Sequence, residues 1–237
     1  MNFIAVALFL LTALVNIYNN KRVQSRWNHL LTLISKPLLM PLLMIIYVLN
    51  TSTIHYFVIL ALTFAWLGDC VIIFHHELNH QKPTKNMIPL LAGLGFFLCG
   101  HLTYISQFIK DIDSPNIYVF LCITVYLVCG LFVYRYLLKN GLLNKTNPKI
   151  SQRTKKILRT AIAVYMTVIM LFSFTALLRW TSLSNTTAFI TVLGTLFFIT
   201  SDTTLSLKEF GELDFLPEQL VMITYISAQS LIVFSLL

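Results

Sequence analysis

Two aspartates stand inside long apolar stretches of the sequence. Asp69 lies in the run 54–74 directly after a glycine, and Asp202 lies in the run 186–206. An acid at the centre of a bilayer costs at least about 2.5–3.5 kcal/mol, so such residues usually face the protein interior and mark a functional site. If the two carboxyl groups are close, repulsion and desolvation leave a proton on one of them, which makes the pair an acid and a base together. We interpret Asp69 and Asp202 as candidate catalytic residues, with buried structural anchors as the alternative.

A lysine stands in another apolar run, 30–49, where Lys36 precedes Pro37 and Pro41 follows. Proline removes a backbone donor and disturbs the previous turn, so we expect this segment to break and to leave carbonyl groups facing a cavity. Lys36 would then neutralise an acid or hold a substrate phosphate. The alternative is a side chain that extends to the membrane surface.

Further polar residues in the apolar runs are candidates for binding a substrate. His101 and Tyr104 are spaced i, i+3, and Tyr225 and Gln229 are spaced i, i+4, so each pair can lie on one helix face. We predict a substrate-binding role for these residues, together with two others: His101, Tyr104, Tyr165, Ser201, Tyr225 and Gln229. A hydrogen-bonded core histidine is the alternative for His101, and helix–helix hydrogen bonding is the alternative for Tyr225 and Gln229.

A histidine cluster follows the run 54–74. His75, His76 and His80 would, with Asp69 and His101, supply the residue types of a zinc site. Adjacent histidines point in different directions on a helix, however, and the loop beyond them should be hydrated. We therefore expect no metal and no cofactor.

The composition is that of a membrane protein. The 237 residues are 57% hydrophobic and only 11% charged, and the mean hydropathy is +0.78, whereas a soluble domain has about 25% charged residues. We predict an all-α, polytopic membrane bundle of about eight helices in a single domain, 1–237. The predicted spans are 3–18, 30–49, 54–74, 87–108, 116–138, 158–178, 186–206 and 218–237.

The basic residues are distributed unevenly between the two sets of interhelical loops. The loops after the first, third, fifth and seventh spans contain twelve: Lys21, Arg22, Arg26, Lys82, Lys85, Lys139, Lys145, Lys149, Arg153, Lys155, Lys156 and Lys208. The other loops contain Lys110 and Arg179. Loops rich in Lys and Arg face the cytoplasm, so we expect both termini outside. This bias also explains the net charge of +8 without a nucleic-acid partner.

The same orientation converts sequence offsets into depths. Counted from the cytoplasmic ends of their spans at 1.5 Å per residue, Lys36, Asp69, Tyr165 and Asp202 lie roughly 6–11 Å below the membrane surface. Residues that are far apart in sequence thus share one layer. We expect the site in the cytoplasmic leaflet, just beneath the lipid headgroups.

Several segments resemble the YhhN-like lysoplasmalogenase family. They are Lys36-Pro37, Gly68-Asp69, residues 93–104 (GLGFFLCGHLTY), residues 194–202 (GTLFFITSD) and residues 225–232 (YISAQSLI). The resemblance implies an integral membrane hydrolase of about eight helices, whose paired acids match Asp69 and Asp202. Its substrates would be lysoplasmalogens with an ethanolamine or choline headgroup. Cleavage of their sn-1 vinyl ether gives a fatty aldehyde and a glycerophospho-base.

The two acids fit the chemistry of vinyl ether hydrolysis. The slow step is protonation of an alkene carbon, which gives an oxocarbenium ion that water captures. One carboxyl would donate the proton while the other, ionised, stabilises the cation; the sequence does not decide which does which. The expected partners are a lysophospholipid, water and membrane lipids. A transporter or channel that uses the acids as proton or cation sites remains the alternative.

Overall fold

The computed structural model describes residues 2–20, 26–80, 87–113, 119, 121–144, 151–213 and 215–237. Within these ranges the chain forms eight α-helices, one short 3-10 helix and no strand. The helices are α1 (Phe3–Asn19), α2 (Arg26–Asn50), α3 (Tyr56–His80), α4 (Ile88–Phe108), α5 (Leu121–Asn140), α6 (Gln152–Leu183), α7 (Thr186–Glu209) and α8 (Glu218–Phe234), with the 3-10 helix η1 (Ile109–Asp111) after α4. The predicted all-α bundle is confirmed.

The apolar helices identify an integral membrane protein. Among the described residues, six helices, α2 to α7, are long and apolar enough to cross a membrane, while α1 and α8 are apolar but have 17 residues each. A helix lies at each of the eight predicted spans. The helix α6 extends beyond the predicted 158–178 at both ends. At its N-terminus the Ser151 hydroxyl accepts the Thr154 backbone N–H, and the helix begins early. Arg153, Lys155 and Lys156 therefore lie in its first turns rather than in a loop.

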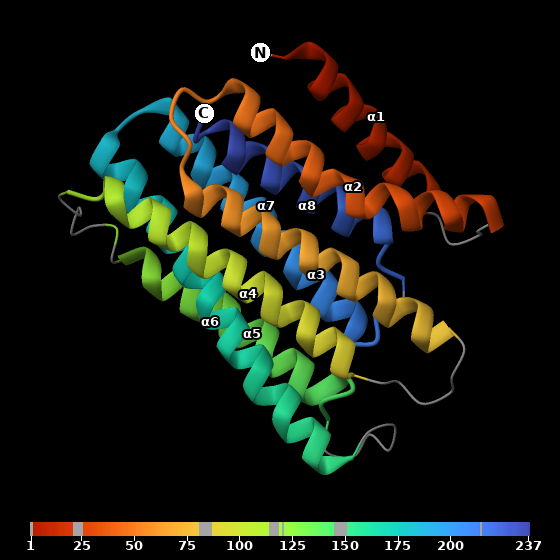
Figure 1. Ribbon diagram of the computed structural model, residues 1–237. Coiled ribbons are helices and arrows are strands. Elements are labelled where there is room, and N and C mark those ends of the chain that lie inside the picture. The colour runs from red at the N-terminus through yellow and green to blue at the C-terminus, as the bar shows by residue number, and fades with distance from the viewer. Residues whose placement is uncertain are drawn as a thin grey trace.

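The expected break in the second span is wrong. The helix α2 continues from Arg26 to Asn50 with Pro37 and Pro41 inside it, and Figure 1 shows it changing direction along its length. Each proline lacks one backbone donor, and packing against neighbouring helices lets a membrane helix tolerate that loss as a bend. The side chain of Lys36 is thus carried on a continuous helix.

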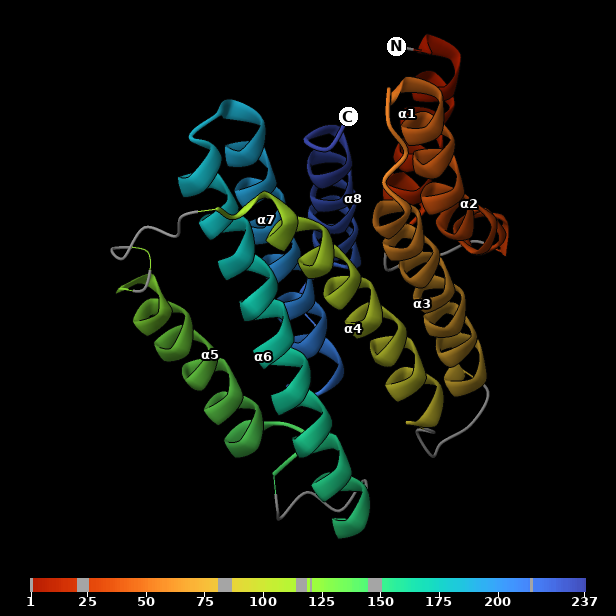
Figure 2. The same ribbon diagram turned by 60° about the vertical axis from the view of Figure 1, so that its left-hand side comes forward.

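The helices pack mainly as neighbours in sequence, α1 with α2, α3 with α4, and α7 with α8, and α6 joins α4 to α7. Glycines permit the close contacts. A Cβ at Gly100 would lie 3.3 Å from the Ala61 carbonyl oxygen, and a Cβ at Gly194 would lie 3.1 Å from that of Ala228. Small residues at helix crossings let backbones approach in this way. Helix α5 contacts α6 and lies at the edge of the bundle (Figure 2).

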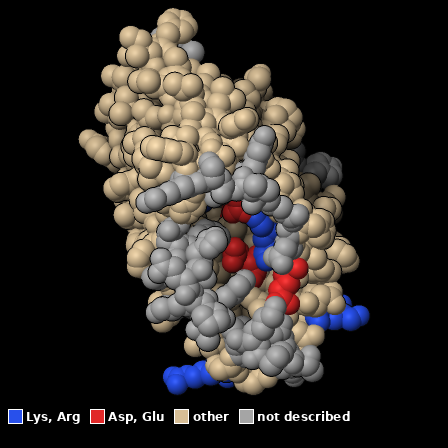
Figure 3. Space-filling model, turned by 90° about the vertical axis from the view of Figure 1, so that its right-hand side faces the viewer, with Lys and Arg blue, Asp and Glu red and all other residues tan. Residues whose placement is uncertain are grey.

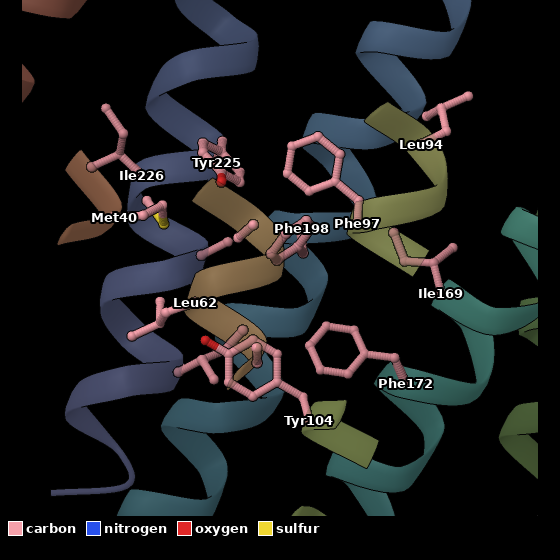
Figure 4. Close-up of a cluster of buried hydrophobic side chains, with 14 of the residues drawn as sticks. Met40, Leu62, Leu94, Phe97, Tyr104, Ile169, Phe172, Phe198, Tyr225 and Ile226 are labelled. Carbon is pink, nitrogen blue, oxygen red and sulfur yellow. The ribbon is translucent and has the colours of Figure 1, made fainter. Parts of the chain in front are cut away.

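Aromatic side chains fill the centre of the bundle. Figure 4 shows Phe97 and Tyr104 of α4, Phe172 of α6, Phe198 of α7 and Tyr225 of α8 turned toward one another. The Phe172 ring is 5.8 Å from that of Tyr104 and 6.0 Å from that of Phe198, measured between centroids. Such offset and edge-to-face pairs stabilise a core beyond simple burial. The candidate site lies against this aromatic cluster.

Candidate functional site

Asp69 is bound by residues of two other helices. Its side chain, on α3, is 2% exposed, and the Tyr225 hydroxyl of α8 donates a hydrogen bond of 2.8 Å to its Oδ2. The Nζ of Lys36, on α2, lies 3.9 Å from its Oδ1. A nearby cation and a donated hydrogen bond offset part of the cost of burying a carboxylate. We call Asp69, Lys36 and Tyr225 the closed cluster.

Buried polar residues extend the closed cluster into the core. The Tyr104 hydroxyl of α4 donates to Gln229 Oε1 of α8 over 2.9 Å. Gln229 lies one turn after Tyr225 on α8, and Tyr225 donates to Asp69. Buried polar side chains thus continue from the closed cluster along α8 to α4.

Asp202 is bound by a second tyrosine. The Tyr165 hydroxyl of α6 donates a short hydrogen bond to Asp202 Oδ2 on α7. The Nε2 of His101, on α4, lies 3.2 Å from the Tyr165 hydroxyl oxygen and 3.6 Å from Asp202 Oδ2. The Asp202 side chain is 14% exposed, while that of His101 is buried. We call Asp202, Tyr165 and His101 the open cluster.

One aromatic ring contacts both clusters. The Phe198 ring lies 5.6 Å from the Tyr225 ring of the closed cluster and 4.6 Å from the His101 ring of the open cluster, between centroids. The ring therefore lies between two clusters whose carboxyl groups accept hydrogen bonds from different tyrosines.

The open cluster faces a cavity of about 90 Å³ between α5, α6 and α7. Tyr165 and Asp202 form part of its wall, and most of the remaining lining is apolar. The lining residues are Tyr126, Cys129, Gly130, Val133, Tyr165, Met166, Ile169, Met170, Ile199, Asp202, Thr203 and Ser206. A carboxylate is thus exposed to an apolar space within the membrane-spanning part of the molecule. In the closed cluster, Asp69 and Lys36 do not line this cavity.

Comparison with protein families gives a match to the YhhN family over residues 31–236. The chain belongs to the YhhN family. The match spans α2 to α8 almost completely and includes all nine predicted site residues. Neither the curated proteins nor the solved structures contain a match to this chain.

The charged end of this YhhN-family chain lies near the ends of α3, α7 and α8. Figure 3 shows acidic and basic side chains gathered in a hollow on this face. Lys208 of α7 forms an ion pair with Glu218 of α8, and His75 Nε2 of α3 lies 3.9 Å from Glu209 Oε2 of α7. These contacts hold the ends of the three helices together. The hollow places charged groups at this end of the bundle.

The histidine cluster remains partly outside the described residues. His75 contacts Glu209, but the side chains of His76 and His80 fall where the structure gives no description. In the described part of the YhhN chain, no group of three or more metal-ligating residues gathers at one point. The absence of a metal site stays a prediction.

Ser201 differs from the other predicted site residues. Its side chain is buried, and its hydroxyl donates to the Val221 carbonyl oxygen of α8 over 3.1 Å. It therefore joins α7 to α8, next to Asp202 in sequence but turned toward another helix. This contact is typical of serine at membrane helix crossings.

Sequence reasoning missed three residues of the site. Phe198, which contacts both clusters, and Gly130 and Met170, which line the cavity, were not predicted to take part in it. A Cβ at Gly130 would lie 1.7 Å from the terminal methyl carbon of Met170. A glycine within an otherwise bulky apolar helix was the available signal that α5 approaches a neighbour there.

Proposed function

We propose that this protein is a membrane hydrolase of lysoplasmalogens. It would cleave the sn-1 vinyl ether to give a fatty aldehyde and glycerophosphoethanolamine or glycerophosphocholine. The YhhN family membership supports a membrane protein of this kind. The observation that carries the proposal is Asp202, a membrane-embedded carboxyl that accepts a tyrosine hydrogen bond and lines an apolar cavity.

In the proposed mechanism Asp202 supplies the proton. It borders the apolar space that a lipid can enter, and among the described residues its side-chain partners are Tyr165 and His101, with no lysine or arginine in an ion pair with it. It protonates the vinyl carbon that is not bonded to oxygen, and the adjacent carbon becomes part of an oxocarbenium ion. Water adds to that carbon and returns a proton to Asp202. The hemiacetal then collapses to aldehyde and alcohol, with one water consumed.

The closed cluster would supply the fixed negative charge. In this proposal Asp69 is ionised beside Lys36, and the Phe198 ring contacts both Tyr225, its hydrogen-bond donor, and His101 of the open cluster. A preorganised anion near the oxocarbenium ion lowers the barrier because it needs no reorganisation during the reaction. Tyr165 and His101 orient the Asp202 carboxyl toward the cavity.

The test uses purified protein and three lysophospholipids that share headgroup and chain length but carry a vinyl ether, an alkyl ether or an ester. Mass spectrometry should detect aldehyde and glycerophospho-base from the vinyl ether alone. Because general acid catalysis contributes about 10²–10⁴-fold, Asp202→Asn should lower turnover by about that factor. Asp113→Asn makes the same chemical change at an exposed position and should leave turnover intact.

A result without aldehyde from any of the three lipids would overturn the proposal. The transporter alternative would then be tested in proteoliposomes, where flux without product release would favour it. Equal turnover by Asp202→Asn and the unmodified protein would leave the vinyl ether activity standing but remove Asp202 as its acid.

A further inference from the structure

The cavity between α5, α6 and α7 is apolar along most of its length. Apart from Asp202 and Tyr165, its wall is formed largely by aliphatic and methionine side chains. The lining extends from Tyr126 to Val133 on α5 and from Ile199 to Ser206 on α7, about 10 Å along each helix. The cavity therefore follows the helices, with the Asp202 carboxyl at one place and apolar walls beyond it.

The helix that covers this cavity is lightly held. Gly130 and Leu137 are the buried residues of α5, and the remainder of the helix is exposed or half-buried. Its C-terminal end is fixed, because the Leu142 N–H donates to the Phe210 carbonyl oxygen over 2.7 Å. Two of its side chains also form hydrogen bonds to α6: the Tyr126 hydroxyl with Ser173, and the Tyr134 hydroxyl with the Arg159 carbonyl oxygen. Figure 2 shows α5 diverging from the bundle beside α6.

The wall of the cavity is also deformable. Met166 and Met170 are unbranched side chains that can change rotamer at little cost. The absence of a side chain at Gly130 leaves room that the Met170 methyl group occupies. Since 90 Å³ holds only a few water-sized groups, rotation of the methionines and movement of α5 would be needed to admit a longer apolar chain.

We propose that this cavity binds the hydrocarbon chain of a single-chain ether lipid, with the bond to be cleaved beside Asp202. The inference rests on the proposed function and specifies which helices hold the substrate. An apolar space within the membrane region favours a hydrocarbon occupant because water gains few hydrogen bonds there. The chain enters from the surrounding lipid past the lightly held α5, and the polar headgroup lies toward Ser206, in the direction of the charged end.

The test measures binding without cleavage. The probe is a saturated alkyl-ether lysophosphoethanolamine with a diazirine at the end of its chain, which lacks the vinyl group. After illumination of the detergent-purified protein, peptide mass spectrometry should find the label on α5 or α6, and the unlabelled alkyl-ether lipid should compete. Labelling mainly on α1 to α4, or labelling that the competitor does not reduce, would overturn the proposal.

Two variants fill the cavity from opposite sides. Val133→Trp acts from α5 and Met166→Trp from α6. Each should raise the concentration of unlabelled lipid that is required to reduce the labelling by about tenfold, equivalent to about 1.4 kcal/mol. Leu127→Trp makes the same addition at an exposed α5 position outside the cavity and should bind as the unmodified protein does. Size-exclusion chromatography selects the variants that fold. Unchanged competition in a folded cavity variant would contradict the assignment.

The outcomes separate the two proposals. Competed labelling of α5 or α6 without aldehyde release from the vinyl-ether lipid would remove the hydrolase function and leave the chain-binding cavity in place. Aldehyde release with labelling elsewhere would remove the chain-binding cavity and leave the hydrolase function in place.

Discussion

The closed and open clusters use the same chemistry in different surroundings. Both contain an aspartate that accepts a hydrogen bond from a buried tyrosine. Asp69 is almost fully enclosed and has Lys36 as a partner, whereas Asp202 borders a cavity and has His101 as its nearest ionisable base. Both carboxyl groups lie in apolar helices. The clusters differ in the lysine beside Asp69 and in the access that the cavity gives to Asp202.

This contrast shows how one residue type can take two tasks within one helical bundle. Asp69 has a lysine within ion-pair distance, and loss of the carboxylate charge would leave that ammonium group uncompensated. Asp202 has no such lysine among the described residues and borders the apolar cavity, where a substrate could reach its carboxyl group. The comparison therefore predicts a chemical role for Asp202 and an electrostatic and structural role for Asp69.

The largest expected effect comes from Asp202→Asn. Because the amide cannot donate a proton of comparable acidity, turnover of the vinyl-ether lipid should fall about 10²–10⁴-fold. The amide can still accept the Tyr165 hydrogen bond, so the unfolding temperature in detergent should change little. A variant that loses stability and retains most of its turnover would reverse the two assigned roles.

Asp69→Asn should instead reduce stability. It leaves the largely buried Lys36 without its charge partner, which costs about 3 kcal/mol, the lower end of the range for broken buried pairs because Lys36 keeps 15% of its surface exposed. Chemical denaturation in detergent measures this cost. Adding Lys36→Met should recover much of it, since the double variant contains no unpaired charge. Additive losses in the double variant would show that the two residues are not coupled.

Substitution of Tyr165 and Tyr225 tests the same comparison between the clusters, with a smaller expected effect. Tyr165→Phe and Tyr225→Phe each remove one hydrogen bond to a carboxylate, an effect of about 1.5–3 kcal/mol. For Tyr165 we expect the loss mainly in kcat, because its partner performs the chemistry. For Tyr225 we expect it mainly in the free energy of unfolding, since its partner Asp69 is buried and takes no direct part in the proposed proton transfer. Equal effects of both variants on kcat and on stability would remove the distinction between the clusters.

The fold could be predicted from the sequence because the membrane imposes strong constraints. Apolar runs of about 20 residues must form helices, since every backbone group needs a partner in lipid. The predicted break at Pro37 and Pro41 failed because local proline chemistry was given more weight than packing by neighbouring helices. The early start of α6 at Gln152 was missed because hydropathy locates the membrane core and not the polar turns that continue a helix beyond it.

The candidate site could be predicted only in part. Polar residues inside apolar runs identified the members of both clusters, because such residues are rare and costly in lipid. Their pairing depends on the rotation of each helix about its axis, which no single sequence reveals. Ser201 and Asp202 are adjacent, yet one reaches α8 and the other reaches Tyr165 on α6. The cavity could not be predicted either, because its walls are ordinary apolar side chains and the helix faces that line it also depend on helix rotation.

The smallest expected effect is that of Tyr104→Phe, at the residue whose hydroxyl donates to Gln229. The substitution removes one neutral hydrogen bond, to Gln229 Oε1, and should lower the free energy of unfolding by about 1 kcal/mol. Turnover should fall less than in Tyr225→Phe, because Asp69 accepts its hydrogen bond from Tyr225 and not from Tyr104. Gln229→Leu combined with Tyr104→Phe should cost less than the sum of the single changes, since each single change removes the same bond. Strict additivity would mean that Tyr104 and Gln229 do not stabilise the protein through this shared bond.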